Sequence, residues 1–210
     1  MQLSLFGAPD VSARDGLAVL RGFALPHAEA LIAAIEHVTA RAPFRHMATP
    51  GGRALSAAMS NCGRLGWVTD AGGYRYTAED PQTGEAWPAM PGIVNDLAVA
   101  AAGEAGFGFT PDACLINRYV PGARMGLHSD ADEKDDGAPI VSVSLGLPAT
   151  FLFGGLARND PTEKIALEHG DVVVWGGALR RAYHGIAPLR DGEHPVLGRQ
   201  RLNLTIRKAA

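Results

Sequence analysis

Val141-Ser-Val-Ser-Leu-Gly-Leu147 sets the architecture of this chain. Its apolar residues alternate with serine and glycine, the period of two that is typical of a β-strand. Arg201-Leu-Asn-Leu-Thr-Ile-Arg207 repeats the alternation. Short strands separated by glycine, proline and aspartate are expected at about 113–119, 125–130, 140–147, 150–154, 165–168, 171–175, 183–187 and 201–207. The pattern predicts a double-layered jelly roll rather than an alternating α/β fold.

Helical periodicity is confined to the first half of the chain. Between about Pro26 and Thr39, apolar residues recur on one face behind a proline suited to a first helical turn, and Pro91 to Ala105 repeats the pattern. We expect both to be packing helices. The 210 residues contain no linker or repeat. The sequence therefore predicts a single domain, residues 1–210, that is mainly β with flanking helices and needs no disulfide or structural metal to fold.

Composition narrows the possible functions. A formal net charge of -3 and a pI near 6.1 provide no basic footprint, which argues against a high-affinity duplex binder. Cys62 and Cys114 lack C-x-x-C spacing, fit reduced thiols and exclude a cysteine zinc site. The first ten residues do not resemble a secretory signal, and no stretch approaches the roughly 20 apolar residues of a membrane span. We expect a cytoplasmic monomer without membrane contact.

His128-Ser129-Asp130 and the distant His184 offer two imidazoles and one carboxylate. If Met125 to Asp130 is extended, residues two apart point to the same side, so His128 and Asp130 can converge on one ion. Two histidines and one carboxylate suit an open Fe(II) site, which keeps about three of six coordination positions free for a chelating co-substrate and dioxygen. We interpret these residues as a candidate iron site.

A second H-x-D occurs at His169-Gly170-Asp171, so the motif alone is weak evidence. Here the central glycine and the following apolar run, Val172 to Trp175, indicate a turn that enters a buried strand, with Asp171 bonding to local backbone amides. We expect His169 to have a local role rather than a role as metal ligand.

Arg201 and Arg207 lie on the same face of a predicted strand, about 20 Å apart. A guanidinium binds carboxylates through two hydrogen bonds and stays charged at physiological pH. The pair could therefore grip a small dicarboxylate, in which case Arg207→Ala would weaken its binding and leave metal affinity largely intact. The alternative is a polar strand face in water with unpaired arginines.

The chain resembles the AlkB family of iron and 2-oxoglutarate-dependent dioxygenases over nearly its whole length. The matching motifs are Thr49-Pro-Gly-Gly52, Asn61-Cys-Gly63 with Gly66-Trp67, Asp80-Pro-Gln-Thr83, Trp87-Pro-Ala-Met-Pro91, Asn117-Arg-Tyr119, 139–147, Phe153-Gly-Gly155, Asn159-Asp-Pro161, 169–175, Tyr183-His-Gly185 and 201–207. So many ordered matches are far more than coincidence provides.

This resemblance implies a double-stranded β-helix core in residues 111–210, with packing helices and a nucleotide-recognition lid in residues 1–110. It implies that Fe(II) is bound by the catalytic residues His128, Asp130 and His184, with 2-oxoglutarate and dioxygen as co-substrates. The residues implied for 2-oxoglutarate binding are Asn117, Tyr119, Arg201, Asn203 and Arg207.

The resemblance also implies a pocket for a nucleobase. The substrate-binding residues it implies are Trp67, Tyr74, Arg75, Tyr76, Asp132 and Arg158. N1-methyladenine and N3-methylcytosine are cationic rings, which a carboxylate and aromatic faces would favour. An ordinary core tryptophan is the alternative for Trp67.

The segment Gly72-Gly-Tyr-Arg-Tyr76 is interpreted as a mobile, polar lid over this pocket. Arg53, Arg64 and Arg75 lie where nucleic acid is expected, and the sequence leaves open which of them contacts a phosphate.

The predicted function is oxidative demethylation of N-alkylated bases in single-stranded DNA, with RNA left open. Hydroxylation of the methyl group would release formaldehyde and repair the base, while 2-oxoglutarate becomes succinate and carbon dioxide. Two alternatives remain: an oxygenase with a protein or small-molecule substrate, and a non-catalytic binder of damaged nucleic acid whose metal is structural.

Overall fold

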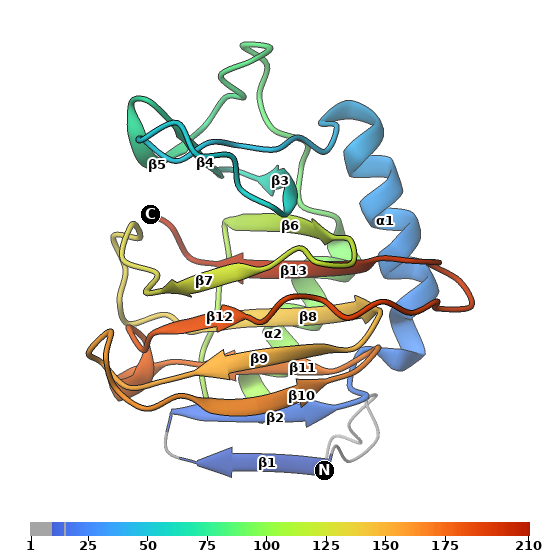
Figure 1. Ribbon diagram of the computed structural model, residues 1–210, viewed down its shortest axis with the longest axis vertical. Coiled ribbons are helices and arrows are strands. Elements are labelled where there is room, and N and C mark those ends of the chain that lie inside the picture. Colours follow the sequence, from blue (N-terminus) through green and yellow to red (C-terminus); the bar gives the residue numbers. More distant parts are fainter. Residues whose placement is uncertain (1–9, 15) are drawn as a thin grey trace.

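The computed structural model describes residues 10–14 and 16–210, so residues 1–9, which carry the expectation about a secretory signal, lie outside it. The larger of two stacked sheets (Figure 1) consists, in spatial order, of β1 (Asp10–Arg14), β2 (Leu17–Arg21), β11 (Val172–Trp175), β8 (Ile140–Gly146), β13 (Arg201–Arg207), β6 (Ala113–Tyr119) and β3 (Ala58–Gly63). The smaller sheet consists of β10 (Glu163–Leu167), β9 (Ala149–Phe153), β12 (His184–Ile186) and β7 (Met125–His128). This architecture confirms the predicted jelly roll.

The two sides of the large sheet differ in polarity at its centre. β8 and β13 pair so that Val143 lies opposite Leu204, and both are fully buried on the side that faces the helices. Ser142 lies opposite Thr205 on the other side, which faces the small sheet. All seven residues of each strand are buried. The alternation in the sequence therefore separates two buried faces, and the expected alternative of a polar face in water is wrong for β13.

Two helices cover the apolar side of the large sheet. These are α1 (Ala28–Arg41), which follows the short 3-10 helix η1 (Leu25–His27), and α2 (Gly92–Glu104). Leu31, Ile35 and Leu97 belong to the same cluster of buried residues as Val143 and Leu204. Each such side chain contributes about 1.5–3 kcal/mol when it is removed from water. Both predicted packing helices are confirmed, and within the described chain neither is long and apolar enough to cross a bilayer.

The space between the sheets is filled at one side by aromatic rings. Phe151 lies 5.8 Å from the ring centroid of Trp175, and both belong to a second buried cluster with Leu17 and Val19. The polar side chains of β13 face the rest of this space. The sandwich therefore has an apolar part that provides stability and a polar part that is available for a site.

The sequence did not indicate five strands in the first eighty residues. β2 has Leu17 and Val19 on one buried face and Ala18 and Leu20 on the other, so it shows no alternation. The segment expected to be a polar lid is β5 (Gly73–Thr77), which pairs with β4 (Gly66–Asp70) in a hairpin. The sequence analysis expected a mobile lid here, whereas the structure has a strand that is paired along its whole length.

Leu204 tests the contribution of the helix-facing side. Leu204→Ala should lower the free energy of unfolding by about 2–5 kcal/mol, because it leaves a cavity under α1 and α2. Val196→Ala, at a side chain that is 64% exposed, should change it by less than about 0.5 kcal/mol. Urea unfolding of both variants measures the difference, and equal effects would contradict the assignment of this face to the core.

Candidate active site

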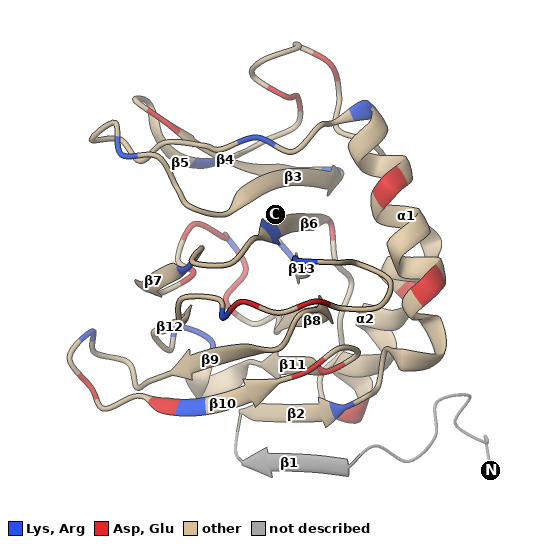
Figure 2. Ribbon diagram, turned by 45° about the vertical axis from the view of Figure 1, so that its right-hand side comes forward, with Lys and Arg blue, Asp and Glu red and all other residues tan. Residues whose placement is uncertain are grey.

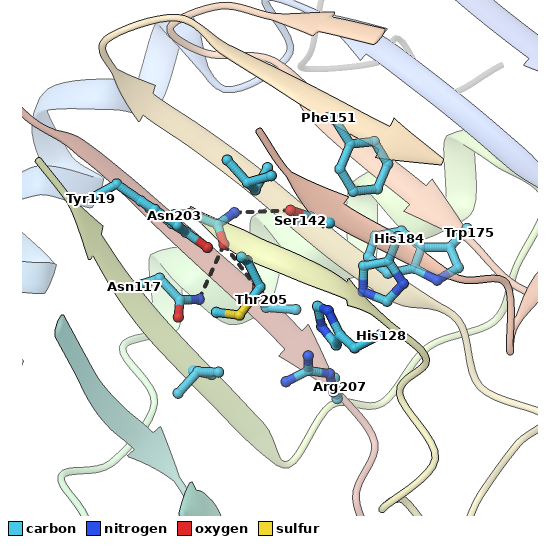
Figure 3. Close-up of a pocket in the computed structure, with 14 residues that line it drawn as sticks. Asn117, Tyr119, His128, Ser142, Phe151, Trp175, His184, Asn203, Thr205 and Arg207 are labelled. Atoms are coloured by element: carbon cyan, nitrogen blue, oxygen red, sulfur yellow. Dashed lines mark hydrogen bonds between the residues drawn. The ribbon is translucent and has the colours of Figure 1, made fainter. Parts of the chain in front are cut away.

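Two neighbouring strands bring the predicted metal ligands together. His128 is the last residue of β7, His184 is the first of β12, and the two lie directly opposite each other. Asp130 follows two residues after His128, and candidate ligand atoms of the three side chains all lie within 4.8 Å of one another. Figure 3 shows both imidazoles beside Arg207 in the pocket between the sheets. β7 ends at His128 rather than at Asp130 as expected, yet the three residues still converge.

Backbone carbonyls fix the orientation of both imidazoles. Nδ1 of His128 lies 2.9 Å from the carbonyl oxygen of Gly126, and Nδ1 of His184 lies 3.0 Å from that of Ala182. A carbonyl oxygen can only accept, so in the neutral form of each ring Nδ1 carries the proton and Nε2 has the lone pair that a metal can bind. Burial, reinforced by His128, lowers the pKa of His184 to about 4. His184 is therefore neutral at neutral pH, as a metal ligand must be.

Asp130 completes the donor set as a buried carboxylate. Its Oδ1 lies 3.5 Å from Nε2 of His128, and its Oδ2 lies 3.8 Å from Nε2 of His184. Nε and Nη2 of Arg207 donate to Oδ2 over 2.8 and 2.5 Å. Burial works to raise the pKa of Asp130, but the neighbouring groups, of which Arg207 has the largest effect, together outweigh it and the pKa falls below its usual range. Two imidazole nitrogens and one ionised carboxylate fit Fe(II).

A second set of unsatisfied groups fits a carboxylate co-substrate. Arg201 is only 1% exposed, lies under the ring of Tyr119 at 5.2 Å and donates from Nη2 to Ser144 Oγ over 2.8 Å. Its Nε and Nη1 have no hydrogen-bond partner within the described chain. A buried guanidinium with two open donors is costly unless an anion satisfies it. Arg201 can therefore take a carboxylate of 2-oxoglutarate.

Asn117 and Asn203 form a hydrogen-bonded pair on neighbouring strands (Figure 3). Asn203 Nδ2 donates to Ser142 Oγ, and its Oδ1 accepts from Asn117 Nδ2 over 3.2 Å and from Thr205 Oγ1 over 3.0 Å. Asn117 Oδ1 has no partner among the described residues. Asn203 thus holds Asn117 in place, and Asn117 keeps the free oxygen.

Arg201 and Arg207, the pair predicted to bind a dicarboxylate, have different partners in the structure. Arg207 is bonded to Asp130 and lies 3.3 Å from Glu133, whereas Arg201 has two donors without a partner among the described residues. Loss of Arg207 would therefore also disturb a metal ligand. The expectation that Arg207→Ala leaves metal affinity intact does not fit this geometry.

Two of the residues predicted for substrate binding form an aromatic stack. The rings of Trp67 and Tyr74 lie 5.8 Å apart at 20°, and Tyr74 is 49% exposed. Trp67 Nε1 donates to Oδ2 of Asp132 over 2.9 Å. Trp67 is only partly buried against the core. The hairpin therefore presents an aromatic surface whose orientation Asp132 stabilises.

The other predicted substrate residues differ in their environment. Arg75 forms a two-point ion pair with Asp70, and Arg158 lies exposed with its guanidinium 6.0 Å from the ring of Tyr183. Tyr76 donates its hydroxyl hydrogen to Glu133 over 2.6 Å, and burial raises the pKa of Tyr76 far above its usual range. The Tyr76 hydroxyl is thus engaged inside the protein.

Sequence analysis did not identify Glu133 and Arg180, which lie 3.2 Å apart beside the metal ligands. Glu133 stands in the run Asp130-Ala-Asp-Glu-Lys-Asp-Asp136, which has the composition of a solvated loop. Its three-residue spacing from Asp130 does not predict the same side of an extended segment, so no sequence signal separates it from its acidic neighbours. Arg180 carries no sequence signal.

The second H-x-D has the local role that was predicted. Asp171 accepts from the backbone N–H groups of Glu168 and Gly22, and His169 Nδ1 accepts from the N–H of Gly146 over 2.9 Å. Asp171 is therefore a turn residue, as expected.

The double sheet and its His-Asp-His centre define an iron-dependent oxygenase. The model of the 2OG-Fe(II) oxygenase superfamily matches residues 16–207, and the chain belongs to that superfamily. Within it, the chain belongs to the AlkB family. It is 58% identical over 195 residues to the Alpha-ketoglutarate-dependent dioxygenase AlkB of Escherichia coli K12, covering 92% of this chain and 90% of that protein. The protein is thus a dioxygenase that uses Fe(II), 2-oxoglutarate and dioxygen.

Two further relatives extend the comparison. A tRNA demethylase of Schizosaccharomyces pombe is 26% identical over 159 residues, which cover 69% of this chain and 53% of that protein. The solved structure of OsALKBH1 has a TM-score of 0.85 and 27% identity, with 94% of this chain and 99% of that chain covered. The fold of that solved structure therefore matches almost the whole of this chain.

Arg201→Lys tests the carboxylate site. Lysine keeps the charge but loses the planar fork, so 2-oxoglutarate should bind about tenfold or more weakly. The affinity for Co(II) should not change, because Arg201 contacts no metal ligand among its described partners. Anaerobic titration of the Fe(II)-loaded protein, followed by the visible absorption of the chelate, measures the first effect. Arg199→Lys, at an exposed ion pair with Asp191, is the control. If Arg201→Lys lowered the affinity for Co(II) as much as the affinity for 2-oxoglutarate, the assignment of Arg201 to the carboxylate would be contradicted.

Proposed function

We propose that this enzyme oxidatively demethylates N-alkylated bases, such as N1-methyladenine and N3-methylcytosine, in single-stranded DNA, and that RNA is also accepted. The proposal rests on the stacked Trp67 and Tyr74 rings. Trp67 is bonded to Asp132, which lies only two residues beyond Asp130. A surface suited to a flat ring therefore lies beside the loop of the metal ligand. An aromatic surface of this kind stacks bases of any sequence.

The chain's own residues divide the work of such a reaction. His128, Asp130 and His184 would hold the iron, and Arg201 would hold 2-oxoglutarate. When bound, Fe(II) with 2-oxoglutarate and dioxygen supplies the oxidant that hydroxylates the methyl group. Trp67 and Tyr74 would orient the base so that its methyl group faces the metal centre. The hydroxylated methyl leaves as formaldehyde, and the base is restored.

Charge favours the cationic lesions. The Asp132 carboxylate and two aromatic faces attract a positively charged ring more strongly than a neutral one. Lesions that block base pairing are also the easiest to extract from a duplex. The tRNA demethylase among the relatives supports the inclusion of RNA. No comparable feature favours a protein or small-molecule substrate.

Phosphate contact is expected to be local. Acidic and basic residues are interspersed along the described elements (Figure 2). Of the three candidate arginines, Arg64 is paired with Asp112 and Arg75 with Asp70. Arg53 is exposed and has no ion-pair partner in the part of the chain that the structure describes. We therefore assign phosphate contact to Arg53.

The proposal extends to the setting of the enzyme. We propose a cytoplasmic monomer with residues 1–110 carrying base recognition and residues 111–210 carrying the catalytic core. Cys62 and Cys114 lie directly opposite each other on β3 and β6, yet both are free and buried. Free thiols in this position fit a reducing compartment.

Turnover provides the direct test. The protein with Fe(II), 2-oxoglutarate and dioxygen should release formaldehyde from a single-stranded oligonucleotide that contains N1-methyladenine, and restore adenine. Asp130→Asn should release none, because the neutral amide replaces the anionic ligand. Formaldehyde release and mass spectrometry of the oligonucleotide measure both. Absence of turnover in wild-type protein with bound iron would overturn the proposal.

Arg53→Ala tests the phosphate contact. Oligonucleotide binding should weaken by a similar factor for all sequences, and the slope of log affinity against log salt should fall by about 1. Fluorescence anisotropy at several salt concentrations measures the slope. Arg199→Ala, which removes an exposed charge between β12 and β13, should leave it unchanged. An unchanged slope in Arg53→Ala would contradict the assignment.

A further inference from the structure

Glu133 is a buried carboxylate that serves no role in the reaction described above. It lies three residues beyond Asp130, and its side chain is only 2% exposed. Its Oε1 accepts a hydrogen bond from the Tyr76 hydroxyl over 2.6 Å and lies 3.3 Å from Nε of Arg207. Its Oε2 lies 3.2 Å from Nη2 of Arg180. A charge in this position is stable only because two guanidiniums surround it.

The same two guanidiniums also hold Asp130. Arg207 donates from Nε and Nη2 to Oδ2 of Asp130, and Arg180 donates from Nη1 to the Asp130 carbonyl oxygen over 3.2 Å. Arg180 Nε is itself fixed by the carbonyl oxygen of Ala138. Glu133 therefore contacts both arginines that fix Asp130. Arg207 holds the Asp130 side chain, and Arg180 holds its backbone carbonyl.

Charge balance gives this bridge an electrostatic consequence. Two guanidiniums, Arg180 and Arg207, are matched by two carboxylates, Asp130 and Glu133. Without the Glu133 charge, the site would carry an uncompensated positive charge, which opposes binding of a divalent cation. Arg207 would also have Asp130 as its one remaining carboxylate and would compete more strongly for the oxygen that the metal needs. Both effects lower metal affinity.

Tyr76 connects this network to the base-recognition hairpin. Tyr76 belongs to β5, two residues after Tyr74, which stacks on Trp67. The Tyr76 hydroxyl bond is the direct hydrogen bond from this strand to Glu133. A hairpin that holds a base and a centre that holds a metal thus share one buried carboxylate.

We propose that Glu133 is a positioning residue that sets the metal affinity through Arg207 and Arg180, and that its bond to Tyr76 couples the β4–β5 hairpin to the metal centre. The inference rests on the proposed roles of that centre and hairpin. Coupling between two sites is reciprocal, so a base seated on the hairpin strengthens metal binding by the same factor by which metal strengthens base binding.

Metal affinity without turnover tests the proposal. Co(II) is titrated into wild-type protein, Glu133→Gln, Tyr76→Phe, the double variant and the control Glu36→Gln, which removes an exposed charge on α1. Glu133→Gln should bind Co(II) roughly tenfold more weakly, as is typical when a partner of a metal ligand is lost. Tyr76→Phe should show a smaller loss in the same direction, and Glu36→Gln none. Because Tyr76 acts through Glu133, Tyr76→Phe should add little in the Glu133→Gln background.

The outcomes separate the proposed function from the coupling. Wild-type protein that does not bind Co(II) would refute the metal centre itself. Wild-type affinity in a folded Glu133→Gln would refute the positioning role. If Glu133→Gln fails to fold, Tyr76→Phe decides alone, since it leaves every ion pair in place: wild-type Co(II) affinity in Tyr76→Phe refutes the coupling, and a loss supports it.

Discussion

The inward orientation of the polar side of β8 and β13 is the constraint on which the rest of the structure depends. Polar residues in the middle of a sheet would ordinarily face water, while apolar ones face the partner sheet. Here Val143 and Leu204 face away from the small sheet, so α1 and α2 must cover them. The hydroxyl, amide and guanidinium groups of β8 and β13 therefore point into the space between the two sheets. The helices are therefore needed to keep the polar face turned inward, although no described residue of α1 or α2 lines the pocket between the sheets.

A polar interior is stable only when its groups are bonded, and most of these groups are. Asn203 uses its amide on Ser142, Asn117 and Thr205, and Arg207 is held by carboxylates. These bonds fix the side chains before any ligand arrives. Preorganisation of this kind spares the enzyme the entropy of ordering its ligands when metal and co-substrate bind.

The sequence was sufficient to predict the eight strands from β6 to β13 and both helices from alternation, from helical periodicity or, for β11, from a short apolar run that follows a turn. The sequence could not show whether the polar face of β8 and β13 faces water or the small sheet, because the alternation of polar and apolar residues is the same in both cases. The sequence analysis missed β2 because Leu17 and Leu20 are buried on opposite faces, so the strand shows no alternation of apolar and polar residues. The metal ligands were predictable from residue type and spacing. Glu133 was not, because its burial comes from Arg180 and Arg207, which reach it from distant parts of the chain.

Unsatisfied groups separate ligand-binding residues from residues that support them. Within the part of the chain that the structure describes, Arg201 has two donors and Asn117 one acceptor without a partner, and the two residues lie on neighbouring strands of the polar face. A carboxylate supplies acceptors for Arg201, and a bound water or a hydroxyl can supply a donor for Asn117. Arg207 also lines the pocket, and its Nε and Nη2 already donate to Asp130. Two arginines on one strand, six residues apart, thus differ in their surroundings: among the described residues Arg201 has two donors without a partner, which suit a carboxylate, whereas Arg207 is bonded to Asp130.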